Sequence, residues 1–438
     1  MFSPVDFPLF NIIVLKHICA NSVKDVEPNF KKQFIVKTKT HIAWLLSLLL
    51  LLCAPDNFSF AAGENSSSTA FAENNCSEQI PTQNIFDVFS QRVAEQIDSF
   101  YRKRVKNDHF NGCVMVAKDG KPIYSAAFGY GNLTFKDTLS TQSSIQLASV
   151  SKTFTGSAIL LLAEQGFLSL DDSVQKFFPD FPYHGITIRL LLSHRTGLPD
   201  YTYWDKNFIG TSAAYLTNQG MMDLLATKKP QVRCKPDHMF IYCNTNYAVL
   251  ASIIENVTGM TYKKFMHDIL FSPLGMANTY VFSPEEGNCC TISYDSKGRV
   301  WKDCAADGVV GDKGIYSSVE DMLKWDNALR TGLVLNKESL NEAYRPRSLD
   351  RYSFAKEKEK NYGYGWRMLK QPDKSYIIYH NGFWHGSNNV FARDLNNGFT
   401  IIVLGNKSNN ANYWTQPIWN ALGQMKNLED VAVETEVQ

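Results

Sequence analysis

The sequence predicts an α+β protein in which one antiparallel β-sheet, split in the sequence, surrounds a large inserted helical domain. Two observations favour this class. Strand-like alternation occurs in residues 112–129 and again in residues 376–405, whereas residues from about 150 to about 345 have mostly helical and loop patterns. Further helical patterns precede the first strand and follow the last one. We therefore expect N- and C-terminal helices to flank the sheet.

The elements follow in order along a predicted catalytic-size domain of residues 85–426. Residues 62–84 are rich in Ser, Asn, Thr and Glu and indicate a flexible linker. The expected helices are 85–106 and 414–426, and the expected strands are 112–118, 122–129, 376–380, 387–394 and 399–405. Asp119-Gly120 marks the turn of the first hairpin. Residues 427–438 are an acidic tail.

The first 61 residues are expected to be an N-terminal extension and a signal peptide. Residues 42–54 form an apolar run of 13 residues, which is short for a membrane span and typical of a signal-peptide core. Lys37 and Lys39 precede the run, and small residues suitable for cleavage end at Ala61. We expect a periplasmic or secreted protein with no stable membrane span after cleavage. A membrane-anchored protein is the alternative.

Charge and cysteine content exclude several functions. The net charge is +1 and no basic patch stands out, so nucleic acid is not an expected partner. The nine cysteines contain no C-x-x-C pair and no Cys/His set with zinc spacing, so we expect no cofactor and no metal. Export would permit a disulfide between Cys289 or Cys290 and Cys304, whereas Cys113 alternates within a strand and is expected in the core.

Ser149 and Lys152 begin the most informative stretch of the sequence. They are separated by three positions, which places both side chains on one face of a helix. The apolar run 154–163 behind them indicates a helix that is buried nearly all round. Burial disfavours the charged form of a lysine, and an amine that shares a proton with a neighbouring hydroxyl can activate a serine nucleophile. Taken alone, this pair is equally compatible with a helix N-cap and a surface lysine.

Three motifs in order give the pair a context. The segment QLASVSKTFTG around Ser149 resembles the nucleophile motif of the serine β-lactamase and penicillin-binding-protein superfamily. Tyr242-Cys243-Asn244 resembles the Y-x-N motif of class C β-lactamases and of related D-alanyl-D-alanine carboxypeptidases and esterases. His380-Asn381-Gly382 resembles the third motif, in its H-x-G form. The resemblance extends over residues 90–425 and implies a β-lactamase/transpeptidase-like fold.

The resemblance also implies roles for the residues. Ser149 would attack a carbonyl, and Lys152 or Tyr242 would manage its proton, with Lys152 and a charged His380 as the cations that favour a phenolate. Asn244 would bond both Lys152 and the substrate. The N–H groups of Ser149 and Phe383 would form an oxyanion hole. Gly382, with Gly386, would let the substrate approach the strand closely.

His380 stands where most β-lactamases have a lysine, and a neutral imidazole binds a carboxylate less strongly. We therefore expect an acyl-enzyme hydrolase whose small-molecule or peptide substrate has a reactive carbonyl: a D-alanyl peptide, or a small ester or amide. A true β-lactamase and an inactive penicillin-binding relative are the alternatives. His194 is expected to hold a loop. Four residues near it, Asp200, Tyr201, Tyr203 and Trp204, and also Trp384, would line the cleft or pack in the core.

Overall fold

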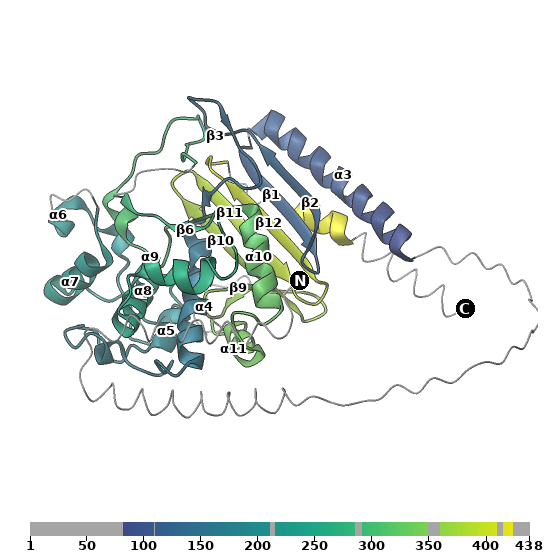
Figure 1. Cartoon of the computed structure of the whole chain (residues 1–438). Coiled ribbons are helices and arrows are strands. Elements are labelled where there is room, and N and C mark those ends of the chain that lie inside the picture. Colours follow the sequence, from purple (N-terminus) through teal and green to yellow (C-terminus); the bar gives the residue numbers. More distant parts are fainter. Residues whose placement is uncertain are drawn as a thin grey trace, which may run out of the picture.

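The computed structural model describes residues 82–108, 110–210, 215–284, 291–348, 360–409 and 415–423. Its centre is a seven-stranded antiparallel sheet with the order β2-β1-β12-β11-β10-β9-β8 (Figure 1). The strands are β1 (Gly112–Lys118), β2 (Lys121–Phe128), β8 (Lys360–Tyr362), β9 (Arg367–Lys370), β10 (Tyr376–Trp384), β11 (Ser387–Asp394) and β12 (Phe399–Gly405). Two strands from the first part of the chain thus join five from the last part, which confirms the predicted α+β class and the split sheet.

The predicted strand boundaries differ from the observed ones mainly at β10 and its neighbours. β1, β11 and β12 begin and end at the predicted residues, and β2 is displaced by one residue. β10 continues four residues past the predicted end, to Trp384. β8 and β9 were not predicted, because three and four residues are too few to establish an alternating pattern.

The sheet buries both of its faces, and the alternation of β1 decides which side chain faces which layer. Val114 and Val116 pack in one cluster with α3 (Thr82–Asp108) and with the helical residues 416–423. Cys113 and Met115 pack on the opposite face, in the core that includes the inserted helices. The predicted core position of Cys113 is confirmed.

The inserted region is mostly helical but contains short strands as well. Its helices are α4 (Ser151–Glu164), α5 (Ile188–Leu192), α6 (Lys206–Ile209), α7 (Asn218–Lys228), α8 (Asn244–Thr258), α9 (Tyr262–Phe265), which continues into a π-helical turn, α10 (Val319–Arg330) and α11 (Lys337–Ala343). A small sheet joins β5 (Ile145–Gln146), β7 (Ile315–Ser317) and β6 (Tyr280–Val281), and β3 (Tyr130–Asn132) pairs with β4 (Asp137–Thr138). The two short strands β6 and β7 modify the prediction of helices and loops for residues 150–345.

Two features fix the inserted region against the sheet. Every residue of α4 from Ser151 to Leu162 is buried, which confirms the predicted buried helix. The Arg393 guanidinium of β11 pairs with Asp326 of α10 at 2.5 Å, and both side chains are buried. Asp326 also accepts a hydrogen bond from Thr400 of β12. These bonds hold α10 against the central strands.

Several sequence predictions fall outside the described residues. The signal peptide, most of the 62–84 linker, Cys289, Cys290 and the acidic tail are among them. α3 begins at Thr82, so the last three residues of the predicted linker are helical. Cys304 has a free thiol. Among the helices of the described ranges, none is long and apolar enough to cross a membrane.

Candidate active site

Ser149 lies at the junction of two helical segments. It is the middle residue of the 3₁₀ turn η1 (Ala148–Val150), which leads directly into α4. Ala148, just before it, has a φ of 49°, a left-handed conformation that is uncommon for a residue with a side chain. Ser149 is half-buried, while its neighbours on both sides are buried. The turn therefore presents the serine hydroxyl from an otherwise buried segment.

Lys152 is completely buried, and its ammonium nitrogen has three acceptors. Nζ lies 3.1 Å from Ser149 Oγ, 2.9 Å from Asn244 Oδ1 and 2.8 Å from the main-chain oxygen of Asp312. The two carbonyl oxygens can only accept, whereas the serine hydroxyl can donate or accept. A neutral amine would therefore give its two hydrogens to the carbonyls and present its lone pair to the Ser149 hydroxyl. A proton can move between Ser149 and Lys152 while the other two bonds stay in place.

Asp200 fixes the orientation of Asn244. Its Oδ2 atom accepts hydrogen bonds from the Asn244 backbone N–H at 2.8 Å and from Nδ2 at 3.2 Å. Because a carboxylate offers only acceptors to these donors, the amide nitrogen must face Asp200 and the amide oxygen must face Lys152. The sequence suggested Asp200 only as a residue of the cleft wall or core. The structure gives it a positioning role.

Tyr242 lies beside Lys152 with its hydroxyl uncommitted. The ammonium is 5.0 Å from the centre of the Tyr242 ring. The phenol oxygen is buried and has no hydrogen-bond partner among the described residues. The Cys243 thiol points the other way, toward the carbonyls of Leu198 and Pro199. A buried hydroxyl without a partner is costly unless another molecule bonds it, so this group is suited to a substrate or water.

His380 is buried at the centre of a directed chain of hydrogen bonds. The Cys243 backbone N–H donates to Nδ1 of His194 at 3.2 Å, so Nε2 of His194 carries the proton and donates to the Tyr362 hydroxyl at 3.3 Å. Tyr362 then donates to Nε2 of His380 at 3.1 Å, and Nδ1 of His380 donates to the Asn381 carbonyl at 2.8 Å. The donor at one end and the acceptor at the other fix both tautomers. His194 holds the loop that carries Cys243, as expected.

The expectation of a charged His380 is wrong. Burial holds the pKa of His380 well below its usual range, and the nearby cations Arg367 and Lys152 lower that pKa further. Burial has the same effect on the pKa of His194. The second cation beside Tyr242 is instead Arg367, whose guanidinium carbon lies 4.9 Å from the centre of that ring. Sequence reasoning missed Arg367 because it lies on the unpredicted strand β9.

The edge of β10 faces the serine turn. β9 pairs with β10 only from Tyr376 to Tyr379, so residues 380–384 have their ladder partners in β11. A Cβ atom on Gly382 would stand 2.1 Å from the Leu147 carbonyl, and one on Gly386 would stand 2.3 Å from the Tyr294 carbonyl. Both glycines thus accommodate the chain's own backbone, which the sequence did not predict. Phe383 follows on this edge with an exposed side chain.

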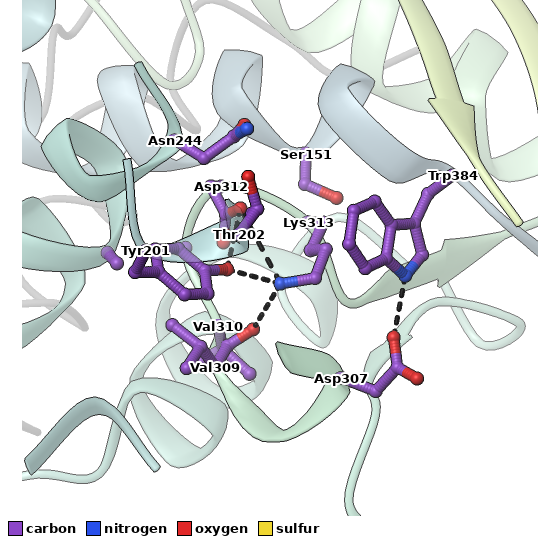
Figure 2. Close-up of polar contacts among 12 residues, drawn as sticks. Ser151, Tyr201, Thr202, Asn244, Asp307, Val309, Val310, Asp312, Lys313 and Trp384 are labelled. Carbon is purple, nitrogen blue, oxygen red and sulfur yellow. Dashed lines mark hydrogen bonds and ion pairs between the residues drawn. The ribbon is translucent and has the colours of Figure 1, made fainter. Parts of the chain in front are cut away.

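A second buried lysine lies next to the first. Lys313 lies between the rings of Tyr201 and Trp384, with Nζ 4.8 Å and 4.9 Å from their centres (Figure 2). Nζ donates to the Tyr201 hydroxyl and to the Val309 carbonyl, and it lies 3.6 Å from the Asp312 carboxylate. Burial lowers the pKa of Lys313, while Asp312 opposes that shift. No motif in the sequence singled out this lysine.

The aromatic residues proposed for the cleft separate into different environments. Tyr201 is buried beside Lys313, and Tyr203 is largely exposed. Trp204 is partly buried and packs against Phe208 with ring centres 4.8 Å apart. The Trp384 indole N–H donates to the Asp307 carboxylate at 2.6 Å (Figure 2). Of this set, Tyr201 and Trp384 are joined around one side chain, and Tyr203 and Trp204 lie apart from it.

These side chains and the split sheet define a class of protein. A buried serine–lysine pair, a Y-x-N segment that bonds the lysine, and a free strand edge against the serine turn are together typical of the β-lactamase and penicillin-binding-protein superfamily. A sequence profile of the Beta-lactamase family matches residues 97–422. The chain therefore belongs to the Beta-lactamase family.

Known proteins show the same relationship. The chain is 33% identical to Penicillin-binding protein 4* of Bacillus subtilis (strain 168) over 341 residues, which are 74% of this chain and 74% of that protein. It is similar in structure to the octameric penicillin-binding protein homologue from Pyrococcus abyssi, with a TM-score of 0.61, 25% identity, and coverage of 72% of this chain and 74% of that one. The D-amino acid amidase from Ochrobactrum anthropi SV3 shares the fold, with a TM-score of 0.61, 23% identity, and coverage of 78% and 99%.

Proposed function

We propose that the protein is a serine hydrolase that forms an acyl-enzyme on Ser149. The observation that carries the proposal is the hydrogen-bond arrangement of Lys152, because two of its acceptors are carbonyls and the third is the Ser149 hydroxyl. Lys152 would take the serine proton as Oγ bonds to the substrate carbonyl. The N–H groups of Ser149 and Phe383 would bond the developing oxyanion. Tyr242 would then protonate the leaving group and later activate water.

The proposed substrates are D-alanyl peptides, or small esters and amides. The neutral His380 offers no charge to the carboxylate of a β-lactam, and this observation supports placing β-lactams behind the other substrates. Similarity to a protein named for penicillin binding keeps a true β-lactamase as the second candidate. An inactive relative that only binds wall peptides or a partner is the third, and the complete set of Ser149, Lys152, Tyr242 and Asn244 argues against it.

We also propose export to the periplasm or the cell exterior, on the basis of the apolar run at residues 42–54. Expression of the full chain followed by fractionation and mass spectrometry of the mature N-terminus tests this proposal. A mature protein that begins near Ala62 would support it. A mature protein that retains residues 42–54 would support the membrane-anchored alternative.

A substrate panel tests the proposed activity. The panel contains a D-Ala-D-Ala peptide, p-nitrophenyl esters and a chromogenic cephalosporin, each with the wild type, Ser149→Ala and Ser151→Ala. Ser151 is the matched control, because its hydroxyl is two residues away but accepts a bond from the Ile315 backbone N–H. Turnover should vanish only in Ser149→Ala. Equal hydrolysis by Ser149→Ala and the wild type would refute the assignment.

A further inference from the structure

Three different metal-binding side chains converge at the far end of β10. Cys304, Asp307 and His385 each offer one ligand atom, and these atoms all lie within 4.8 Å of one another. Asp307 is buried, the His385 side chain is largely buried, and Cys304 is exposed. Two of them come from the segment before β7 and the third from the turn between β10 and β11. A thiolate, a carboxylate and an imidazole together make a mixed S/O/N donor set.

The neighbouring groups hold the carboxylate of Asp307 in place. The Cys304 backbone N–H donates to Oδ2 at 2.6 Å, and the Trp384 indole N–H donates to Oδ1 at 2.6 Å (Figure 2). His385 Nε2 lies 2.9 Å from both carboxylate oxygens. The Trp301 ring lies 5.8 Å from the His385 ring. Such outer contacts are what orient the ligands of natural metal sites.

The cluster also has an open side. Asp307 and His385 line a cavity of about 380 Å³, together with Gln146, Ser293, Trp301 and Tyr316. Zinc sites that react or exchange ligands have three protein ligands and leave a fourth position to water or another molecule. The cavity provides the space for that fourth ligand.

We propose that Cys304, Asp307 and His385 bind one zinc ion, with the fourth coordination position facing this cavity. Zinc suits the set because it accepts thiolate, imidazole and carboxylate ligands and needs no redox change. On binding, the Cys304 thiol loses its proton to solvent, and the metal replaces the hydrogen bonds between His385 and Asp307. The site differs from the earlier expectation of no metal, because the ligands come from separate segments and have no zinc-type spacing.

The zinc proposal does not depend on the proposed hydrolase function. The site lies two residues beyond Phe383, on the strand whose N–H group is proposed to bond the oxyanion, and its ligands are different from the residues assigned to the acyl-enzyme. Metal binding can therefore be measured by itself, without a substrate.

Metal titration of the purified, reduced full-length protein tests the site. Zinc added to metal-free protein should bind with a stoichiometry of one and raise Tm, and cobalt should give a thiolate-to-metal charge-transfer band. Cys304→Ser and His385→Gln should each weaken zinc binding at least ~10-fold, and Cys304→Ser should remove the band. Cys234→Ser is the matched control, because this half-buried thiol lies outside the cluster.

Two results would overturn the proposal. One is a metal-free wild type that binds no zinc although circular dichroism shows it folded. The other is stoichiometric binding that both Cys304→Ser and His385→Gln leave unchanged. Where a variant fails to fold, the conservative change Asp307→Asn replaces it in the same titration, with the same expected loss of affinity.

Discussion

The two buried lysines of the site are neighbours in space but have opposite surroundings. Lys152 donates to three uncharged oxygens, one of which is a hydroxyl that can also donate. Lys313 lies near a carboxylate and between two aromatic rings. Both lysines contact Asp312, Lys152 through the main-chain oxygen and Lys313 through the side chain. One residue thus separates a lysine that can exchange a proton from a lysine held in a cage.

The difference shows what a lysine needs in order to act as a base. A nearby carboxylate favours the ammonium form and competes for its hydrogens, whereas neutral carbonyls hold an amine without requiring its charge. Lys313 is stabilised by Asp312 and the aromatic rings, so its contribution should be to stability. Lys152 has a hydroxyl as the third acceptor, so its contribution should be to turnover.

Loss of Lys152 should have the largest effect. Lys152→Ala should lower kcat/KM by ~10³–10⁴-fold, because it removes the group that takes the serine proton. Lys152→Arg should not restore activity, since a guanidinium does not give up its proton. Steady-state kinetics on whichever panel substrate is turned over measures both. Activity of Lys152→Ala within tenfold of the wild type would contradict the assigned role.

The two tyrosines next to the lysines should also differ. Tyr242→Phe should lower kcat by ~10²–10³-fold with little change in stability, because the lost hydroxyl has no partner among the described residues. Tyr201→Phe should instead lower stability, since its hydroxyl bonds the Asp312 carboxylate at 2.9 Å and also Lys313. Kinetics and urea unfolding of both variants provide the comparison. The prediction fails if Tyr242→Phe keeps full kcat.

Loss of Lys313 should affect mainly the free energy of unfolding. Lys313→Met should lower it by about 3 kcal/mol, because the Asp312 carboxylate remains buried without its cation. The double variant Asp312→Asn/Lys313→Met should recover part of this loss. Urea unfolding measures the stabilities, and kcat of the folded protein should fall less than tenfold. A loss of kcat equal to that of Lys152→Ala would remove the distinction between the two lysines.

The buried histidines predict a pH dependence of stability that neither lysine produces. The pKa values of His194 and His380 are lowered in the folded protein, so both stay neutral below pH 6.5 while the unfolded chain binds a proton at each. Stability should therefore fall with pH below ~6.5, by about 1.4 kcal/mol per pH unit for each histidine, until the folded pKa is reached. Above that pH the two contribute no slope.

Urea unfolding between pH 7.5 and 5.5 measures this slope. His380→Gln is the test variant, and it should reduce the slope by the contribution of one histidine. His184, for which no burial-dependent role is proposed, provides the control His184→Gln, whose slope should equal that of the wild type. An unchanged slope in His380→Gln would show that His380 does not remain neutral in the folded protein.

The sequence predicted the parts of the fold and site that depend on local patterns. The alternation of β1, β11 and β12 and the apolar run of α4 were sufficient to place those elements. Contact between Lys152 and Asn244 also follows from the ordered motifs. Each of these predictions depends on residues that are close in sequence or on a motif with fixed spacing.

The remaining parts of the site depend on contacts between distant segments. Asp200 positions Asn244 across 44 residues, and Arg367 approaches Tyr242 from a strand too short to predict. Lys313 becomes a site residue only when Tyr201 and Trp384 close around it. The charge of His380 also could not be read from the sequence, because its burial is a property of the tertiary structure.

The account depends most directly on a covalent bond to Ser149. The measurement is the intact mass of the protein quenched during turnover of an ester or a penicillin, followed by peptide mapping of the adduct. The account predicts one acyl group, located on Ser149, that is absent from Ser149→Ala and present in Ser151→Ala. Substrate turnover with the acyl group on another residue would contradict it.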